Sequence, residues 1–320
     1  MAFFQRLNTN AESIIDTGFG SNTEIQGGRF INKDGKPNVK KSGIGFFEGI
    51  SWYHTLLSLT RIQFLLIIFL FYFLVNIFFA FIYYYIGVEH LNGIDATKEL
   101  DKFSQAFFFS IQTFTTVGYG HINPEGFITS TIAAVEALTG LLSFALATGL
   151  FYGRFSKPKA YIIFSENALI SPYQDKTALM FRLAPNKNTH LTDLEVKVTL
   201  ALQVIENGET KNKFYNLDLE VDKISALNLS WTIVHPIDDK SPLWGYKENE
   251  FKNQNGEVIV FLKAFDDMFS SSVIKRTSYI FNEIIYGAKF NLMFSKNEKS
   301  TLTNLHMDKL NSFENKNLDN

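Results

Sequence analysis

The sequence has no cysteine among its 320 residues, which excludes disulfide bonds, iron–sulfur clusters and thiolate zinc sites. Its net charge of −2 gives no sign of nucleic-acid binding, and its polar N-terminus lacks the pattern of a signal peptide. Nucleophile–base groupings, phosphate-binding glycine loops and histidines at metal-ligand spacing are also missing from the sequence. These absences argue against an enzyme and against a nucleic-acid-binding protein.

Charged residues are absent from one long hydrophobic stretch, residues 62–86, and a second stretch, residues 127–153, contains only Glu136. A helix needs about 20 residues to cross the hydrocarbon core of a bilayer, and both stretches exceed that length. Phenylalanine occurs 33 times, an excess that fits helices facing lipid. The sequence therefore predicts two membrane-spanning helices, the first with an aromatic belt at its outer end formed by Tyr83, Tyr84 and Tyr85.

Between the two spans, a shorter hydrophobic run at residues 104–115 leads into Thr-Val-Gly-Tyr-Gly at residues 116–120. The run is too short to cross, so we expect a re-entrant pore helix followed by non-helical backbone that lines a pore. The two glycines allow backbone angles that a β-carbon penalises, so four such strands could ring an axis and bind dehydrated K+ through their carbonyl oxygens. The predicted selectivity filter is Thr116, Val117, Gly118, Tyr119 and Gly120, with K+ bound at the first four residues.

Basic residues are concentrated before the first span and after the second one. The segment between the spans has only Lys98 and Lys102, whereas the flanking segments carry Arg6, Arg29, Lys33, Lys36, Lys40, Lys41, Arg61, Arg154, Lys157 and Lys159. Because lysine and arginine favour the cytoplasmic side, we expect both termini in the cytoplasm and the protein in the cell (inner) membrane.

Residues 46–58 precede the first span and place Phe46, Ile50, Tyr53 and Leu57 on one helical face. This pattern favours a helix lying in the inner membrane interface over an N-terminal extension of the spanning helix.

The second half of the chain changes to short strand-like runs separated by turn residues, and residues 194–202 alternate with period two. We therefore expect an immunoglobulin-like β-sandwich. The predicted domains are an N-terminal segment (1–45), an interfacial slide helix (46–58), a pore domain (59–157), a cytoplasmic β-sandwich (158–296) and a polar tail predicted to be disordered (297–320).

Many short segments together resemble one family. They include Gly28-Arg29-Phe30, Tyr53-His54, residues 109–113, Ser156-Lys157-Pro158-Lys159, residues 164–168, residues 179–183, residues 230–237, residues 275–279 and Gly287-Ala288-Lys289-Phe290. With the filter sequence, they make the chain similar to inward-rectifier potassium channels of the prokaryotic branch. The resemblance implies a homotetramer whose cytoplasmic domains extend the pore, with filter-bound K+, no other cofactor, Ba2+ and polyamines as blockers, and regulation by anionic lipids.

The chain departs from the family at several positions. The acid–arginine pair found behind the filter in many eukaryotic members corresponds to Gln112 and Ile122, so Gln112 is expected to support the filter by hydrogen bonding instead. Acidic sites that control rectification correspond to Phe144 and Lys263, and only Asp193 keeps an acidic position in the cytoplasmic pore. Block by polyamines needs negative rings, so we expect weak rectification.

Phe144, Thr148 and Tyr152 share one face of the second span. If that face lines the pore, Tyr152 forms an aromatic ring that gates the inner end by dewetting; the alternative is helix–helix packing. Gly140 and Gly149 could act as bending points or as close-packing sites.

Glu136 is an acid inside a span, so it either supports the filter through hydrogen bonds or attracts ions in the cavity. The predicted lipid contacts are Arg61, Arg154, Lys157 and Lys159, either as general positive flanks or as a specific anionic-lipid site. The function expected from the sequence is passive, K+-selective transport through a tetrameric channel. The alternative is a membrane-anchored ligand sensor that uses the same scaffold with little conduction.

Overall fold

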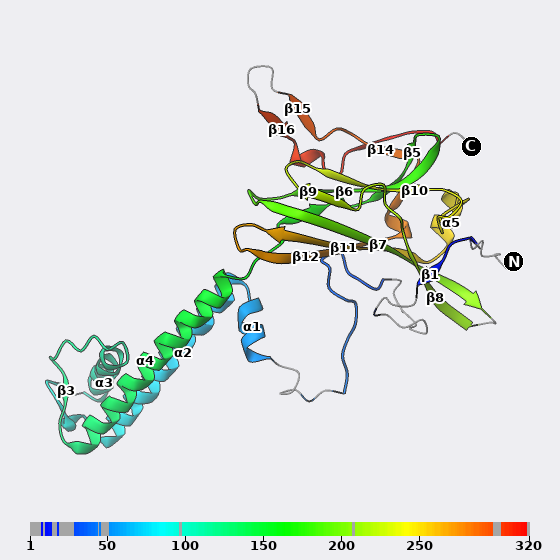
Figure 1. Cartoon of the computed structure of the whole chain (residues 1–320). Coiled ribbons are helices and arrows are strands. Elements are labelled where there is room, and N and C mark those ends of the chain that lie inside the picture. Colours follow the sequence, from blue (N-terminus) through cyan, green and yellow to red (C-terminus); the bar gives the residue numbers. More distant parts are fainter. Residues whose placement is uncertain are drawn as a thin grey trace. The chain divides into compact units, whose positions relative to one another are not determined.

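The computed structural model describes residues 8, 10–14, 18, 29–43, 45, 51–95, 98–206, 209–296 and 302–318 (Figure 1). The chain forms two compact units, which we describe separately. The helical unit is Ser42–Lys157, and the sandwich unit combines Met1–Lys41 with Pro158–Asn320. The helical unit is therefore an insertion between two stretches of the chain that build the sandwich unit.

The helical unit contains two helices that are long and apolar enough to cross a membrane. They are α2 (Arg61–Ile86) and α4 (Phe127–Phe155), with mean hydropathies of 2.8 and 1.6. The shorter elements are α1 (Trp52–Ser58), η1 (Val88–His90), β2 (Leu91–Asn92), α3 (Glu99–Phe114) and β3 (Asn123–Pro124). The pore helix was expected at residues 104–115, and α3 begins five residues earlier, at Glu99, because Glu99 and Asp101 are favourable in the first turn of a helix.

Helices α1 and α2 are separate elements. Leu59 and Thr60 have extended backbone, and Thr60 caps α2 by accepting a hydrogen bond from the Gln63 N–H at 3.3 Å. The Gln63 side chain accepts the Thr60 N–H at 3.1 Å, which completes a capping box. Helix α1 is therefore not an extension of α2. The predicted slide helix extended back to residue 46, and residues 46–50 lie outside the described residues.

Helix α4 packs closely against the end of α3 at one glycine. A β-carbon on Gly140 would lie 1.9 Å from the carbonyl oxygen of Phe114, whereas one on Gly149 would meet no described atom within 4 Å. Helix α4 continues without interruption from Phe127 to Phe155. Gly140 therefore permits close packing of α4 against the end of α3.

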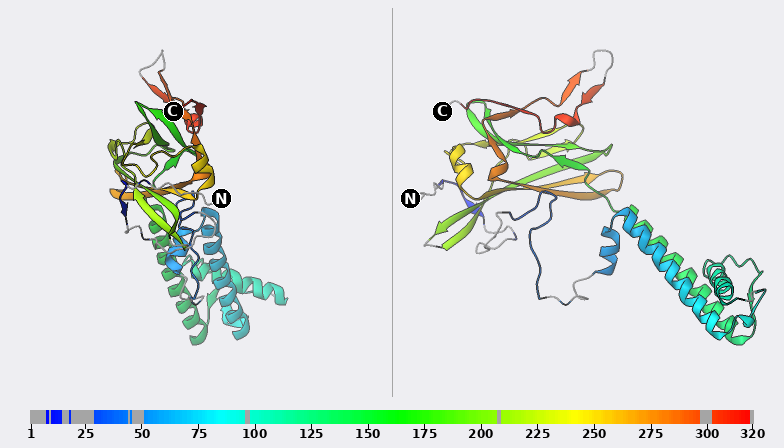
Figure 2. Two further views of the ribbon diagram at one scale, coloured as in Figure 1. Left: turned by 90° about the vertical axis from the view of Figure 1, so that its right-hand side faces the viewer. Right: turned by 180° about the vertical axis from the view of Figure 1, so that it is seen from behind.

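The sandwich unit contains two stacked sheets (Figure 2). The larger sheet has strand order β1-β8-β7-β11-β12, with β9 also paired to β7. Its strands are β1 (Ser13–Ile14), β7 (Leu191–Glu206), β8 (Glu209–Asn216), β9 (Lys223–Ala226), β11 (Gly256–Asp266) and β12 (Ser271–Ile280).

The smaller sheet has the order β10-β6-β5-β13, with β4 paired to β6. Its strands are β4 (Ile162–Phe164), β5 (Ala168–Tyr173), β6 (Lys176–Pro185), β10 (Trp231–Ile237) and β13 (Ile284–Tyr286). The short helices are α5 (Glu248–Asn253) and η2 (Phe281–Glu283).

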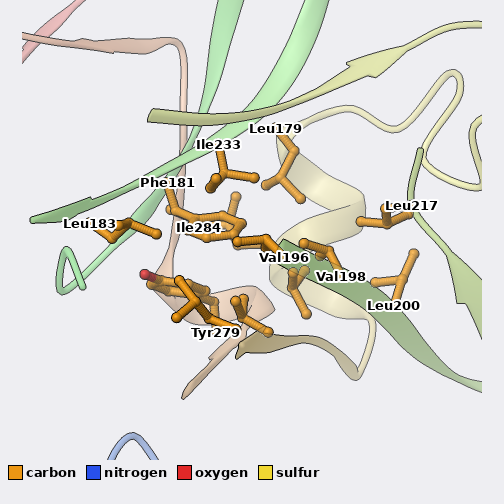
Figure 3. Close-up of a cluster of buried hydrophobic side chains, with 14 of the residues drawn as sticks. Leu179, Phe181, Leu183, Val196, Val198, Leu200, Leu217, Ile233, Tyr279 and Ile284 are labelled. Atoms are coloured by element: carbon orange, nitrogen blue, oxygen red, sulfur yellow. The ribbon is translucent and has the colours of Figure 1, made fainter. Parts of the chain in front are cut away.

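The period-two pattern of β7 sends its apolar side chains into the space between the sheets. Val196, Val198 and Leu200 meet Phe181 and Ile233 of the smaller sheet (Figure 3). This apolar layer holds the two sheets together, since burying one large aliphatic side chain contributes about 1.5–3 kcal/mol. The β-sandwich expected from the alternation is present.

An N-terminal segment, residues 29–38, is bound along the larger sheet. The buried carboxylate of Glu257 accepts hydrogen bonds from the N–H groups of Phe30 and Ile31, the latter at 3.0 Å. Burial raises the pKa of the Glu257 carboxyl, and these hydrogen bonds oppose that shift. The hydroxyl of Thr277 donates to the Lys33 carbonyl at 3.2 Å, so several contacts hold the segment in place.

The prediction of disorder from residue 297 onward is wrong for residues 302–318. Strand β16 (Thr303–Leu305) pairs with β15 (Phe294–Lys296), and β17 (Phe313–Asn315) pairs with β14 (Ala288–Phe290). Between them lies η3 (Met307–Lys309). The segment is polar on average, but Leu310 is buried in a small cluster with Ala184 and Met293. A few well-placed apolar residues are enough to fix it against the sandwich.

Candidate ion-conduction site

Backbone angles alternate along the predicted filter. Thr116, Gly118 and Gly120 have positive φ values of 59°, 51° and 82°. When left- and right-handed backbone conformations alternate, successive carbonyl groups point to the same side. In a β-strand, by contrast, successive carbonyl groups point to opposite sides. A left-handed β-branched residue such as Thr116 is rare, and strained backbone of this kind concentrates at functional sites. The segment is therefore built to present a row of carbonyl oxygens.

The lower end of this segment is fixed to the pore helix by main-chain hydrogen bonds. The Gln112 carbonyl accepts the N–H groups of Val117 at 3.0 Å and Gly118 at 3.3 Å, and the Thr113 carbonyl accepts the Thr116 N–H at 3.0 Å. The Gln112 side chain forms no hydrogen bond with any described residue. Gln112 thus contacts the filter through its main chain, whereas the sequence suggested its side chain.

The filter side chains have few neighbours within one chain. Tyr119 is 80% exposed and Val117 is 54% exposed. β-Carbons on Gly118 and Gly120 would meet no described atom within 4 Å. Glycine is required at these two positions by backbone conformation and not by lack of space.

The outer end of the filter is held by a small hairpin-like pairing. Leu91 pairs with Pro124 and Asn92 pairs with Asn123. Gly93 approaches so closely that a β-carbon there would lie 2.0 Å from the His121 carbonyl oxygen. The role of Gly93 was not foreseen from the sequence, because a single glycine in a loop gives no specific signal.

Glu136 lies fully buried between α2, α3 and α4. Its carboxyl accepts a hydrogen bond from the Tyr83 hydroxyl at 2.6 Å and is also hydrogen-bonded to the Ser110 hydroxyl. Tyr83 is 1% exposed, so its assignment to an aromatic belt was wrong. The buried Asn76, the one amide within α2 beyond its first turn, was the sequence signal that could have indicated this polar cluster.

The three predicted gate residues form one exposed face of α4. Phe144 and Tyr152 are each 74% exposed, and Thr148 between them donates to the Phe144 carbonyl at 2.9 Å. Large exposed aromatic side chains along one helix face are available to a pore or to neighbouring chains. The gate assignment stays a prediction.

Arg154 binds main-chain carbonyls at the C-terminal end of α1. Its Nη2 donates to the Leu59 carbonyl at 2.6 Å, and its Nη1 lies 3.4 Å from the carbonyls of Leu56 and Leu57. The guanidinium also lies 5.0 Å from the centre of the Phe64 ring. Arg154 is therefore already engaged by α1 and α2, whereas Arg61, Lys157 and Lys159 are exposed. Lipid contact by these four residues stays a prediction.

Asp193 and Lys263 line one cavity of about 540 Å³ in the sandwich unit, together with Glu195 and Lys223. Asp193 has a φ of 46° at a β-bulge, where the register between β7 and β11 shifts between Lys263 and Phe265. The Lys223 ammonium lies 3.9 Å from the Glu195 carboxylate. The surface around Asp193 therefore carries both signs of charge, which would weaken a negative ring.

The chain combines two helices able to span a membrane, a short helix leading to a strand of aligned carbonyls, and a β-sandwich. These elements define a pore-loop channel with an additional β domain. Residues 162–317 match the inward rectifier potassium channel C-terminal domain, and residues 67–157 match the ion channel family of pore domains. The inward rectifier potassium channel Kirbac3.1 of Paramagnetospirillum magnetotacticum is 33% identical over 267 residues, covering 82% of this chain and 88% of that protein. The chain therefore belongs to the inward rectifier potassium channel family, in its prokaryotic branch.

Another relative is the G protein-activated inward rectifier potassium channel 4 of mouse. It is 29% identical, and the match covers 82% of this chain and 67% of the relative. The solved structure of the sporulation control protein Spo0M from Bacillus subtilis matches 42% of this chain and 58% of its own with 9% identity and a TM-score of 0.23, which is too low to indicate a shared fold. The family is one of ion channels, which is not a class of enzymes.

Proposed function

We propose that this chain forms a homotetrameric channel through which K+ crosses the membrane passively and selectively, with residues 116–120 as the filter. The observation that carries the proposal is the alternation of positive φ at Thr116, Gly118 and Gly120 at the end of a helix too short to cross a bilayer. One strand cannot surround an ion, and closed rotational symmetry supplies the other strands. In this arrangement, carbonyls of Thr116, Val117, Gly118 and Tyr119 bind K+ in place of its hydration shell.

The inner gate is assigned to the exposed face of α4. Four copies of Tyr152 form an apolar ring that closes the inner end by dewetting, and Phe144 lines the cavity above it. Because Phe144 and Lys263 replace acidic residues, Asp193 is the one of these family positions that stays acidic and attracts cations to the cytoplasmic vestibule. Rectification and polyamine block are therefore weak, whereas Ba2+ blocks at the filter.

Membrane orientation follows the distribution of basic residues, with both termini in the cytoplasm and the channel in the cell (inner) membrane. Anionic lipids bind near Arg61, Lys157 and Lys159, the exposed cations at the inner ends of the spans. A lipid can favour the open channel only by binding it more tightly than the closed one.

Uptake of Rb+ into liposomes that contain the purified protein tests the proposed function. Wild-type protein should accumulate Rb+ in a Ba2+-sensitive manner and should exclude Na+. A protein that forms tetramers but shows no Ba2+-sensitive uptake in any lipid mixture would instead support a membrane-anchored sensor. Repeating the assay with neutral and anionic lipids tests the lipid assignment in the same preparation.

A further inference from the structure

Four polar side chains form a chain of contacts in the apolar interior of the helical unit. Asn76 and Tyr83 come from α2, Ser110 from α3 and Glu136 from α4, and each is at most 1% exposed. The Tyr83 hydroxyl lies 2.6 Å from Glu136 Oε2, and the Ser110 hydroxyl is hydrogen-bonded to Glu136 Oε1. Ser110 Oγ also lies 3.1 Å from both the main-chain carbonyl oxygen and Oδ1 of Asn76, and Asn76 Nδ2 lies 2.7 Å from the Tyr72 carbonyl.

The orientation of the Asn76 amide is fixed by its neighbours. If the amide were rotated so that its oxygen replaced its nitrogen, two carbonyl oxygens would face each other 2.7 Å apart, at Asn76 and Tyr72. The amide nitrogen must therefore face Tyr72, which leaves Asn76 Oδ1 facing Ser110. Both Asn76 oxygens that Ser110 contacts, Oδ1 and the main-chain carbonyl oxygen, are acceptors, so the hydroxyl of Ser110 has to donate toward Asn76.

The protons in this chain of contacts can then be counted. A serine hydroxyl has one proton, and the contacts with the two acceptor oxygens of Asn76 use it. The contact between Ser110 and Glu136 then lacks a proton unless Glu136 supplies one. With an ionised Glu136, no proton is left for the contact between Ser110 and Glu136. With a neutral Glu136, the carboxyl group donates in that contact, and the Ser110 proton is shared by the two Asn76 oxygens.

Within the part of the chain that the structure describes, Glu136 forms no ion pair that would stabilise a carboxylate. Among the described residues, no lysine, arginine or histidine is within 4.0 Å of its oxygens. The charged residues on the three helices stand at their ends, apart from Glu136 itself: Arg61 on α2, Glu99, Asp101 and Lys102 on α3, and Arg154 on α4. At 1.5 Å per helical residue, Arg61 is more than about 20 Å from Asn76 along α2. Burying a carboxylate without a positive partner costs free energy, so the distance of Glu136 from positive charges also favours its neutral form.

We propose that Glu136 is a neutral carboxylic acid in the assembled channel, and that it positions the filter by donating a hydrogen bond to Ser110 of the pore helix. Ser110 precedes Gln112 by two residues, and the Gln112 carbonyl holds the base of the filter. The acid thereby connects α2 and α4 to the helix that carries the filter. The positioning role rests on the proposed function, whereas the protonation state does not.

Substitutions that keep or remove the proton donor test the positioning role. Glutamine can accept from Tyr83 and donate to Ser110, as the neutral acid does. We expect Glu136→Gln to form tetramers with Rb+ flux and K+/Na+ preference within about threefold of wild type, because one neutral hydrogen bond replaces another. Glu136→Leu leaves Tyr83 and Ser110 unpaired and should reduce the K+/Na+ preference by about tenfold or more. Failure of Glu136→Gln to assemble, or an equal loss in both variants, would overturn the proposal.

Infrared spectroscopy tests the protonation state independently of conduction. Wild-type tetramers at neutral pH should show the C=O stretch of a protonated carboxyl group, above the amide I band, with a shift in D₂O. The band should disappear in Glu136→Gln and persist in Glu125→Gln, which removes an exposed acid close to the start of α4. A wild-type spectrum without this band would show that Glu136 is ionised. If the wild-type protein shows the band but no Rb+ uptake, the proposed function fails while the neutral acid stands.

Discussion

The sandwich unit and the helical unit use apolar residues in opposite ways. In the sandwich unit, residues of both sheets bury one another in a single large core that includes Phe181, Leu194 and Tyr279. In the helical unit, α2 and α4 leave most of their apolar side chains exposed, among them Phe69, Tyr85 and Leu146. The side chains that this unit buries deepest include the polar residues Asn76, Ser110 and Glu136.

This difference shows which of the two units buries its hydrophobic surface within a single chain. The sandwich closes its own hydrophobic core, so its packing is decided within the chain. The helical unit exposes its apolar faces to lipid and to other copies, so polar contacts and close backbone packing have to fix its internal geometry. Changes in the helical unit should therefore affect assembly and conduction, whereas changes in the sandwich unit should affect mainly stability and cation supply.

The largest effect is expected from Gly140→Ala. The new β-carbon would lie 1.9 Å from the Phe114 carbonyl oxygen, so α4 and the pore helix must separate at a cost of about 3 kcal/mol or more. We expect loss of the tetramer in size-exclusion chromatography. Gly149→Ala is the matched control in the same helix, because its β-carbon meets no described atom within 4 Å. Equal behaviour of the two variants would contradict close packing at Gly140.

Gly118→Ala should abolish selective flux without preventing assembly. Gly118 has a φ of 51°, where a β-carbon costs about 1–2 kcal/mol in each of four copies. Space is not the limit, since no described atom lies near the new methyl group. Tetramer content and Rb+ uptake would be measured together. A tetrameric variant that still prefers K+ over Na+ would refute the filter assignment.

Tyr152→Ala should raise basal Rb+ uptake several-fold and leave the K+/Na+ preference unchanged, because gate and filter are separate. Tyr152 is 74% exposed, so its removal leaves no cavity within the chain. Leu146→Ala, at an exposed position on a different face of α4, serves as the control. Wild-type flux in a tetrameric Tyr152→Ala variant would place the constriction elsewhere.

Asp193→Asn should lower single-channel conductance moderately, and mainly at low ionic strength, where charges are poorly screened. The carboxylate is exposed at a bulge, so the substitution removes charge with little effect on packing. Recordings at several KCl concentrations would show whether Asp193 acts through its charge or through the structure of the bulge. A reduction that is the same at all salt concentrations would indicate a structural role.

The smallest effect concerns the stability of the sandwich in mild acid. Burial lowers the pKa of His235 from its ordinary value of 6.5, and its ring nitrogens contact the Asp218 carbonyl at 2.6 Å and the Ser241 hydroxyl at 2.8 Å. The unfolded chain therefore binds a proton at higher pH than the folded one, so stability is full above 6.5 and falls as pH decreases below it. Thermal melting followed by tryptophan fluorescence should show this loss in wild type and less of it in His235→Asn. If the melting temperatures of the two proteins changed with pH in the same way, His235 would not be the group responsible for the loss of stability in acid.

The sequence was most informative where one residue type is required at a defined spacing. Charge-free stretches indicated the spans, and Gly118 and Gly120 indicated backbone with positive φ, which only glycine adopts readily. The alternation in β7 indicated a strand with one buried face. In each case a local rule is sufficient, and distant contacts are not needed.

Other features depend on contacts between distant residues. The pairing of Tyr83 and Ser110 with Glu136 spans 53 and 26 residues, and no local pattern predicts it. Strand β12 has no clear alternation in the sequence, because its apolar side chains are interrupted by Lys275 and Arg276, which are only partly buried. The ordered segment after residue 302 was missed because average polarity conceals a single buried leucine, Leu310.

The insertion of the helical unit within the sandwich chain also sets an order for synthesis. Phe30 leaves the ribosome early, but the carboxylate that binds its N–H belongs to Glu257, 227 residues later. At about 5–20 residues per second, translation takes roughly 10 to 45 s to join the two. During that interval the two spans are synthesised, and the Glu257 carboxylate that binds the N-terminal segment has not yet been made. The sandwich can therefore be sealed only after the whole membrane portion has been synthesised, which makes its closure a late step in biogenesis.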